Sequence, residues 1–409
     1  MHTADPPPPS LQHTPAQRGT PLEVLLAFTR LGLTSFGGPV AHLGYFRTEF
    51  VERRRWLDDR SYADLVALCQ FLPGPASSQV GMALGLARAG WLGSFLAWIG
   101  FTLPSAALLV AFAYGIARWG DLAQSGAVHG LKVAAVAVVA QAVWGMAKTL
   151  CPDRARAAIA IVAALLVLTL PSALAQVGAI ALAGLAGWRL LKLPPSQATA
   201  QTSFGVSRTA GIAALTLFFL LLAALPLLAL ASGSPFVHLV DGFYRAGALV
   251  FGGGHVVLPL LQATVVPAGA VSNAEFLAGY GAAQAVPGPL FTFAAYLGAV
   301  MDGPLAPWLG GLVFLLVIFT PAWLLVVGAL PFWDRLRGRA GVQSAMAGAN
   351  AGVVGLLLAA LYDPVWTHAI FSRADFAVAL AAFALLVYAR LSPVLVVLLS
   401  AIAGWAFPG

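Results

Sequence analysis

The chain has 409 residues, of which 60% are hydrophobic and only 9% are Asp, Glu, Lys or Arg. A soluble domain typically carries about 25% charged residues, so this composition excludes an ordinary soluble protein and predicts one that lies in a membrane. The formal net charge of +7 does not indicate a nucleic-acid partner, because basic residues of membrane proteins collect in cytoplasmic loops.

Residues 1–20 form the first segment, which is polar and contains four consecutive prolines at Pro6–Pro9. Such a segment cannot bury enough apolar surface to fold alone, so a disordered tail is expected. The tight cluster of Arg53, Arg54, Arg55 and Arg60 further along marks a cytoplasmic loop.

Long apolar runs then recur through the chain, and a helix needs about 20 apolar residues to cross a bilayer. No segment alternates as a barrel strand does, so the sequence predicts an all-α polytopic membrane protein with about 10 to 13 spanning or re-entrant segments. The main runs are Trp91–Ala117, Leu131–Met146, Ala157–Leu170, Ala173–Leu191, Gly211–Ala231, Pro304–Leu330 and Phe376–Tyr388.

The two halves of the chain repeat one another. The pattern F-x-R-x-G-x-x-x-F-G-G occurs at Phe28–Gly38 and, 215 positions later, at Phe243–Gly253. The pattern Q-x-x-P-G-P follows at Gln70–Pro75 and, 214 positions later, at Gln284–Pro289. Ordered blocks at a nearly constant offset indicate duplication. We therefore expect one helical repeat over 21–192, a linker over 193–207 and a second repeat over 208–409.

Repeats in transporters are often related by a two-fold axis in the membrane plane, with the substrate site at their interface near the midplane. The basic clusters Arg53–Arg60 and Arg335–Arg339 do not occupy corresponding places in the two repeats. That asymmetry is compatible with opposite orientations, so inverted repeats are the hypothesis.

Arg30 and Arg245 occupy the same place in the two repeats, each inside an apolar segment. One interpretation is a pair of guanidinium groups that binds an oxyanion through planar, multidentate donors. The alternative is that each arginine extends from a helix end to the lipid headgroups. The glycine pairs that follow, Gly37-Gly38 and Gly252-Gly253, interrupt helices and are placed in the same site.

The two Pro-Gly-Pro triplets predict broken helices. Proline removes a backbone donor and clashes with the preceding turn, and irregular backbone inside a membrane must be buried in protein or line a cavity. New helices are expected to begin at Pro75 and Pro289, and their first-turn amides would suit an anion. The candidate site residues at these breaks are Gln70, Gly74, Ser77, Ser78, Gln284, Gly288 and Thr292.

Lys132 and its counterpart Asn350 are further candidates for binding substrate. His42 and His255 could carry protons, although structural roles are the alternative for both. No nucleotide-binding or metalloprotease motif occurs, so neither an enzyme, a cofactor nor a metal site is expected.

These blocks resemble the chromate ion transporter family, of the long two-domain type. The resemblance extends from Pro21 to Asp363. It includes Phe28–Pro39, Trp56-Leu57-Asp58, Gln70–Pro75, Gly85–Gly93, Gly100–Ser105, Phe243–Gly253, Gln284–Pro289 and Asn350–Gly355. Pro39 in the first half corresponds to Gly254 in the second, so the two half-sites need not bind equally.

The resemblance implies a carrier in the bacterial cytoplasmic membrane that exports chromate by proton exchange or by the membrane potential, with lipid around it and a homodimer as one possible assembly. An inside-negative potential of about 100 mV favours the exit of a dianion by about 4.6 kcal/mol. Transport of sulfate or another oxyanion is the nearest alternative, since sulfate is also a tetrahedral dianion. An anion channel is the alternative of a different class.

Overall fold

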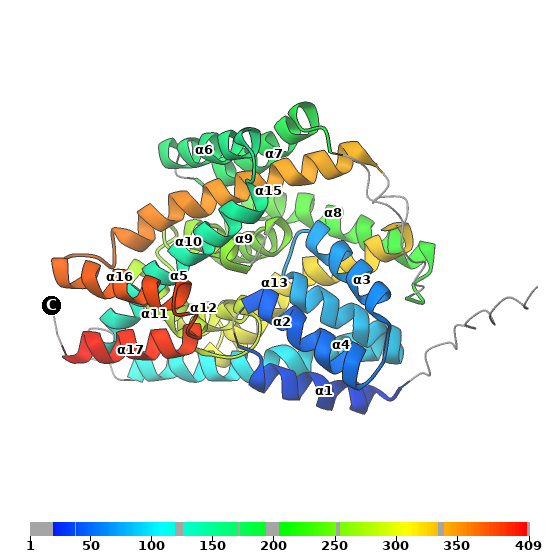
Figure 1. Ribbon diagram of the computed structural model, residues 1–409, viewed down its shortest axis with the longest axis horizontal. Helices are drawn as coiled ribbons and strands as arrows, with labels where there is room; N and C mark the ends of the chain where they lie inside the picture. Colours follow the sequence, from blue (N-terminus) through cyan, green and yellow to red (C-terminus); the bar gives the residue numbers. More distant parts are fainter. Residues whose placement is uncertain are drawn as a thin grey trace, which may run out of the picture.

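The computed structural model describes residues 19–36, 38–118, 126–170, 172–193, 204–250, 254–333 and 339–406, and every regular element in these ranges is helical (Figure 1). The all-α fold predicted from composition is therefore confirmed. The expected tail at 1–20 falls almost wholly outside the described residues, as do most of the expected linker at 193–207 and the glycines Gly37, Gly252 and Gly253.

The first repeat is built from helices interrupted at its centre. Their order is α1 (Pro21–Thr34), α2 (Gly38–Arg47), the π-helical η1 (Thr48–Arg53), α3 (Asp59–Phe71), α4 (Ala76–Arg118), α5 (Gly126–Leu150), α6 (Arg154–Thr169) and α7 (Ala173–Leu190).

The second repeat follows the same order after one additional helix, α8 (Arg208–Ser232). Its elements are α9 (Pro235–Leu249), η3 (Gly254–Val256), α10 (Val257–Val265), α11 (Asn273–Ala285), η4 (Leu290–Thr292), α12 (Phe293–Val300), α13 (Pro307–Ala329), η5 (Leu330–Phe332), α15 (Ala340–Ala360), η6 (Leu361–Trp366), α16 (Arg373–Val387) and α17 (Pro393–Ala406). The pairs α1 and α9, α3 and α11, α5 and α15, α6 and α16, and α7 and α17 correspond.

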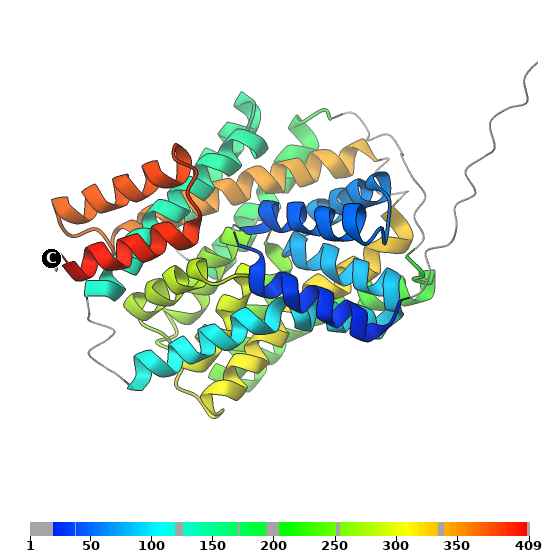
Figure 2. The ribbon, with the colours of Figure 1, turned by 60° about the horizontal axis from the view of Figure 1, so that its bottom comes forward.

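Helix α4 is two helices joined by a sharp reversal. Gly90 has a φ of +67°, a conformation that glycine adopts without steric cost. The two limbs then pack so closely that a methyl group added at Gly85 would collide with the backbone of Gly93 and with Ala97. The second repeat makes the same close approach between Gly298 on α12 and Gly310 on α13. Figure 2 shows the reversal between the light-blue and cyan limbs of α4.

The two repeats exchange their last helices. The final helix of the first repeat, α7, packs along α15 of the second, whereas the final helix of the second repeat, α17, packs along α5 of the first (Figure 1). Small residues permit this approach, because a methyl group at Gly130 would collide with the Ser400 carbonyl and one at Gly348 with the Ala183 carbonyl. The halves therefore form one interlocked unit.

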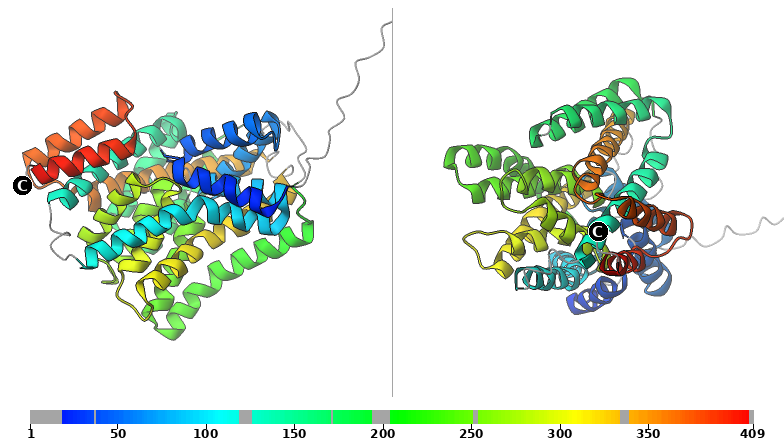
Figure 3. Two further views of the ribbon diagram at one scale, coloured as in Figure 1. Left: turned by 90° about the horizontal axis from the view of Figure 1, so that it is seen from below. Right: turned by 90° about the vertical axis from the view of Figure 1, so that its left-hand side faces the viewer.

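Five of the described helices are long and apolar enough to cross a membrane. These are Ala76–Gly115, which contains the reversal at Gly90, and Gly126–Leu150, Arg208–Ser232, Pro307–Phe332 and Ala340–Trp366. The other helices of the described ranges are shorter, so many of the 10 to 13 expected segments are broken or short pieces. Helix α8 lies along an outer edge (Figure 3), and only 17% of its most apolar window is buried within the protein, as suits contact with lipid.

Candidate functional site

The two Pro-Gly-Pro breaks are joined by reciprocal hydrogen bonds. The amide of Gly74 donates to the carbonyl of Val250 at 2.6 Å, and the amide of Gly288 donates to the carbonyl of Ser35 at 2.9 Å. Gly74 and Gly288 have φ angles of +120° and +92°, which side-chain-bearing residues rarely adopt. Ser35 and Val250 each directly precede the Phe-Gly-Gly sequence of their own repeat. Each break therefore docks on the residue that follows α1 or α9 of the other repeat.

The residues that follow the glycine pairs, Pro39 and Gly254, also approach each other. A methyl group placed on Gly254 would lie 3.7 Å from the side chain of Pro39, its counterpart in the first repeat. The corresponding environments of the breaks match as well. A methyl group on Gly74 would lie 3.3 Å from the Cβ of Ala322, and one on Gly288 would lie 2.8 Å from the Oγ of Ser105. These reciprocal contacts define an approximate two-fold centre between the repeats.

Helix starts after the breaks differ between the repeats. Helix α4 begins at Ala76, directly after Pro75 as expected, so its first amides have no acceptor within the helix. After Pro289 the chain instead makes the 3₁₀ turn η4 before α12 begins at Phe293. The Thr292 hydroxyl donates to the Pro289 carbonyl at 2.8 Å, so its hydrogen closes this turn.

Polar side chains from the first break turn inward. The Gln79 amide donates to the Pro73 carbonyl at 2.8 Å, which fixes the shape of the break. The Ser77 hydroxyl lies 3.4 Å from the Nδ1 of His42, and the neighbouring Ser78 hydroxyl is buried without a partner in the described structure.

The remaining predicted residues occupy different surroundings. Gln70 is exposed at the end of α3, whereas Gln284 is partly buried and its Nε2 lacks a partner among the described residues. Lys132 on α5 is partly buried, and the Oδ1 of Asn350 on α15 is buried without a described partner. His255 is hydrogen-bonded to the Tyr280 hydroxyl at 2.8 Å, as suits a structural histidine.

Arg245 is already engaged by a carboxylate. Its Nη2 lies 2.5 Å from the Oδ2 of Asp241, one turn earlier on α9, and the Asp241 side chain is only 3% exposed. The position corresponding to Asp241 in the first repeat is Leu26, which is 62% exposed. The arginine of the second repeat therefore has a carboxylate partner one turn earlier on its helix, whereas Arg30 has a leucine at that position.

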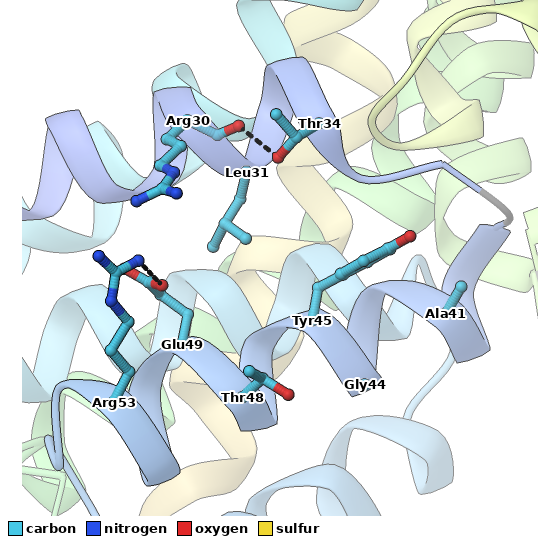
Figure 4. A pocket seen from close by; sticks show the side chains of 9 residues that line it. All are labelled: Arg30, Leu31, Thr34, Ala41, Gly44, Tyr45, Thr48, Glu49 and Arg53. Carbon is cyan, nitrogen blue, oxygen red and sulfur yellow. Dashed lines mark hydrogen bonds and ion pairs between the residues drawn. The ribbon is translucent and has the colours of Figure 1, made fainter.

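Arg30 lines an open depression of about 680 Å³. Its side chain points toward the ion pair of Arg53 and Glu49 (Figure 4), whose charged atoms are 3.2 Å apart. The walls come from α1, α2 and η1, including Tyr45 and Thr48. Arg245 on α9 does not line this depression, so the two arginines do not share it.

Two buried donors, the hydroxyls of Ser35 and Thr102, were not singled out from the sequence as site residues. Ser35 and Thr102 are 0% and 1% exposed, and their hydroxyls lack partners in the described part of the chain. The Nε2 of His42, which is 1% exposed, lacks one too. An unsatisfied buried donor costs about 1–3 kcal/mol. The signal in the sequence was that these polar residues lie in or beside a repeated block. Isolated hydroxyls also occur in apolar helices, however, because they bond to the backbone of their own helix.

A helical protein with five apolar spans, two interlocked repeats and broken helices that meet between them belongs to the class of polytopic membrane transporters. The family model described as chromate transporter matches residues 22–188 and 237–405. The chain thus belongs to the chromate transporter family, and the resemblance expected from its repeated blocks is confirmed. Helix α8 lies outside both matched regions.

Three relatives illustrate the match. The chain is 29% identical to a chromate transport protein of Pseudomonas aeruginosa over 94% of this chain and 92% of the relative. It is 30% identical to a probable chromate transport protein of Synechococcus elongatus over 81% and 82% of the two chains. It is 26% identical to a chromate transport protein of Cupriavidus metallidurans over 83% and 81%. No solved structure matches the chain.

Proposed function

We propose that this membrane transporter exports chromate from the cytoplasm of a bacterium across the inner membrane, by alternating access around the paired breaks. The observation that supports the proposal best is the reciprocal pair of hydrogen bonds, from Gly74 to Val250 and from Gly288 to Ser35. It joins the broken segment of each repeat to the end of α1 or α9 in the other, and transporters place substrate sites between such repeats.

The chemistry at the breaks favours an anion. The first amides of α4 have no intrahelical acceptors, and the N-terminus of a helix attracts negative charge. Buried hydroxyl and amide donors that lack described partners lie beside or within the same segments, including Ser78 and Gln284. A tetrahedral oxyanion presents several acceptor oxygens at once, so it can satisfy such donors together.

The charged residues have separate roles in this proposal. Arg30 attracts the anion to the open depression that it lines with Arg53. Arg245 becomes available to the anion when its ion pair with Asp241 rearranges during the transport cycle. Export follows from the membrane potential alone, which favours exit of a dianion by about 4.6 kcal/mol at 100 mV, and proton exchange adds to this driving force.

Flux of chromate into or out of proteoliposomes that contain the purified chain tests the proposal. Saturable flux that follows an imposed membrane potential or pH gradient, and that resists excess sulfate, is the expected result. Sulfate is the second candidate, because it shares the charge and tetrahedral shape of chromate. Equal competition by sulfate would change the substrate to oxyanions in general, and flux that does not saturate would indicate a channel.

A further inference from the structure

The two halves of the site differ in polarity at four positions around the breaks. In the first repeat these positions hold Ser35, His42, Ser77 and Ser105, and at the corresponding offsets the second repeat holds Val250, Val257, Phe291 and Ala322. The correspondence rests on the reciprocal contacts of the two breaks. At these four positions only the first repeat has polar side chains.

The apolar half is filled by aromatic rings. Phe291 and Phe319 lie with their ring centroids 5.7 Å apart, and they occupy the positions of Ser77 and Thr102 in the first repeat. A serine and a threonine occupy much less volume than two phenylalanine rings, so the first repeat has less side-chain volume at these two positions. The first repeat thus has smaller, polar side chains where the second has packed rings.

The reversal in α4 brings these polar residues to one level. Its limbs run antiparallel on either side of Gly90, so residues equally distant from the turn lie opposite one another. Ser78 is twelve residues before Gly90 and Thr102 is twelve residues after it. Both hydroxyls are buried, at 3% and 1% exposure, and both lack partners in the described structure.

His42 and Ser35 complete the cluster from the neighbouring segment. The His42 ring contacts the Ser77 hydroxyl and the ring of Phe101, whose centroid is 5.2 Å away, and Phe101 directly precedes Thr102. The Ser35 carbonyl accepts from Gly288, which also lies against Ser105. The unpaired atoms of Ser35, His42, Ser78 and Thr102 thus lie on segments of the first repeat that contact one another or the second break.

We infer that these four side chains form a one-sided oxyanion pocket in the first repeat, which binds a tetrahedral dianion through uncharged donors rather than through arginines. This inference rests on the proposed function and assigns its substrate site. Three hydroxyls and an imidazole can donate to several oxygens of one anion. Since no permanent countercharge holds the anion, the pocket can release it in each cycle, as a carrier requires.

The test compares Thr102→Val and Ser78→Ala with the control Thr320→Val in the full-length protein. Thr320 lies on α13, one residue beyond the position that corresponds to Thr102, and its hydroxyl donates to the Leu316 carbonyl at 2.7 Å within its own helix. We expect the KM for chromate flux to rise at least about ten-fold in Thr102→Val and in Ser78→Ala, the typical effect of losing a hydrogen bond to a charged acceptor. Thr320→Val should stay within about two-fold, and Thr102→Ser, which keeps the hydroxyl, should recover most of the affinity.

Binding is measured separately, as the rise in melting temperature that chromate or sulfate gives to the detergent-solubilised full-length protein. The pocket is supported if either anion stabilises the unaltered chain and Thr320→Val but does not stabilise Thr102→Val. This result supports the pocket even if no flux is observed, and in that case only the proposed function fails. Unchanged KM and unchanged stabilisation in both pocket variants would overturn the inference while leaving transport intact. Absence of any stabilisation of the unaltered chain by either anion would overturn it too.

Discussion

Arg245 and Asp241 form an ion pair whose carboxylate is almost completely enclosed. Removing the cation leaves a buried, uncompensated charge, which costs about 3–5 kcal/mol. We therefore expect Arg245→Gln to lower the free energy of unfolding by about this amount, measured by thermal unfolding in detergent. The double variant Asp241→Asn, Arg245→Gln should recover most of the loss. If Arg245→Gln melted at the same temperature as the unaltered protein, the ion pair would have no structural role.

Glu49 connects Arg53 and Arg54 at the polar end of η1, outside the five spanning helices. Burial acts to raise the pKa of this carboxyl, but hydrogen bonds and charge from Arg54 and Arg53 outweigh it, and the pKa lies below its ordinary value of 4.5. A carboxyl with a depressed pKa in the folded state stabilises the fold above its unfolded pKa, and this contribution is lost as the pH falls through the folded pKa.

The expected outcome is that the unaltered protein melts above Glu49→Gln at pH 7 and that the difference shrinks below about pH 4.5. Melting temperatures measured from pH 7 to pH 4 in one detergent check this. Glu52→Gln is the matched control, since Glu52 pairs with Arg47 on an exposed surface where ion pairs contribute about 0–1 kcal/mol. A difference that does not change with pH would show that the charge of Glu49 is unimportant.

Sequence reasoning located the arginines but not their surroundings. Asp241 lies four residues before Arg245, a spacing that places two side chains on one helix face, so this partner could have been predicted. Ser35 and Thr102 could not, because an isolated hydroxyl in an apolar helix usually bonds to its own backbone. Only the assembled structure shows that these hydroxyls lack such partners.

At the scale of the element, the reversals depend on glycines that let two backbones touch. A methyl group at Gly85 or at Gly298 would collide with the facing limb, and overpacking costs about 1–3 kcal/mol. We expect Gly85→Ala and Gly298→Ala to lower the melting temperature. Gly145→Ala on α5 is the control, because a methyl group there meets nothing within 4 Å and alanine favours a helix. Equal melting of the control and the two variants would contradict the packing role of Gly85 and Gly298.

Elements were predictable from sequence where chemistry forces them. The Pro-Gly-Pro triplets cannot continue a helix, and in the structure they separate α3 from α4 and α11 from α12. The apolar run expected from Trp91 matches the second limb of α4, but the reversal of chain direction at Gly90 was not predicted. Its cause is tertiary, namely the close packing of Gly85 on Gly93 across the turn.

At the scale of the whole molecule, inversion of the two repeats remains a prediction. Arg154 and Arg373 are the first residues of the corresponding helices α6 and α16, and both are exposed. In a background without Cys69 and Cys151, Arg154→Cys and Arg373→Cys should react with a membrane-impermeant thiol reagent from opposite sides of the membrane. Labelling of both from the same side would reject the inversion.

The exchange of final helices could not be derived from the repeat pattern. The matching positions of Lys132 and Asn350 show that α5 and α15 correspond, but the pattern is equally compatible with α7 packing on α5 of its own half. Small residues on both helices decide the outcome, since Gly187 lies against Gly348 and Gly404 lies against Gly126 and Gly130. Pairing between distant segments depends on such surfaces rather than on order along the chain.

The exchanged helices also set the timing of biogenesis. Gly404 leaves the ribosome 274 residues after Gly130, its packing partner. At about 5–20 residues per second, α5 waits roughly 14–55 s for α17 to be made. During that interval the glycine face of α5 must be covered by lipid or by the insertion machinery. The first half of the protein therefore stays unfinished until α17 has been synthesised, and loss of α17 would leave α5 without its packing partner.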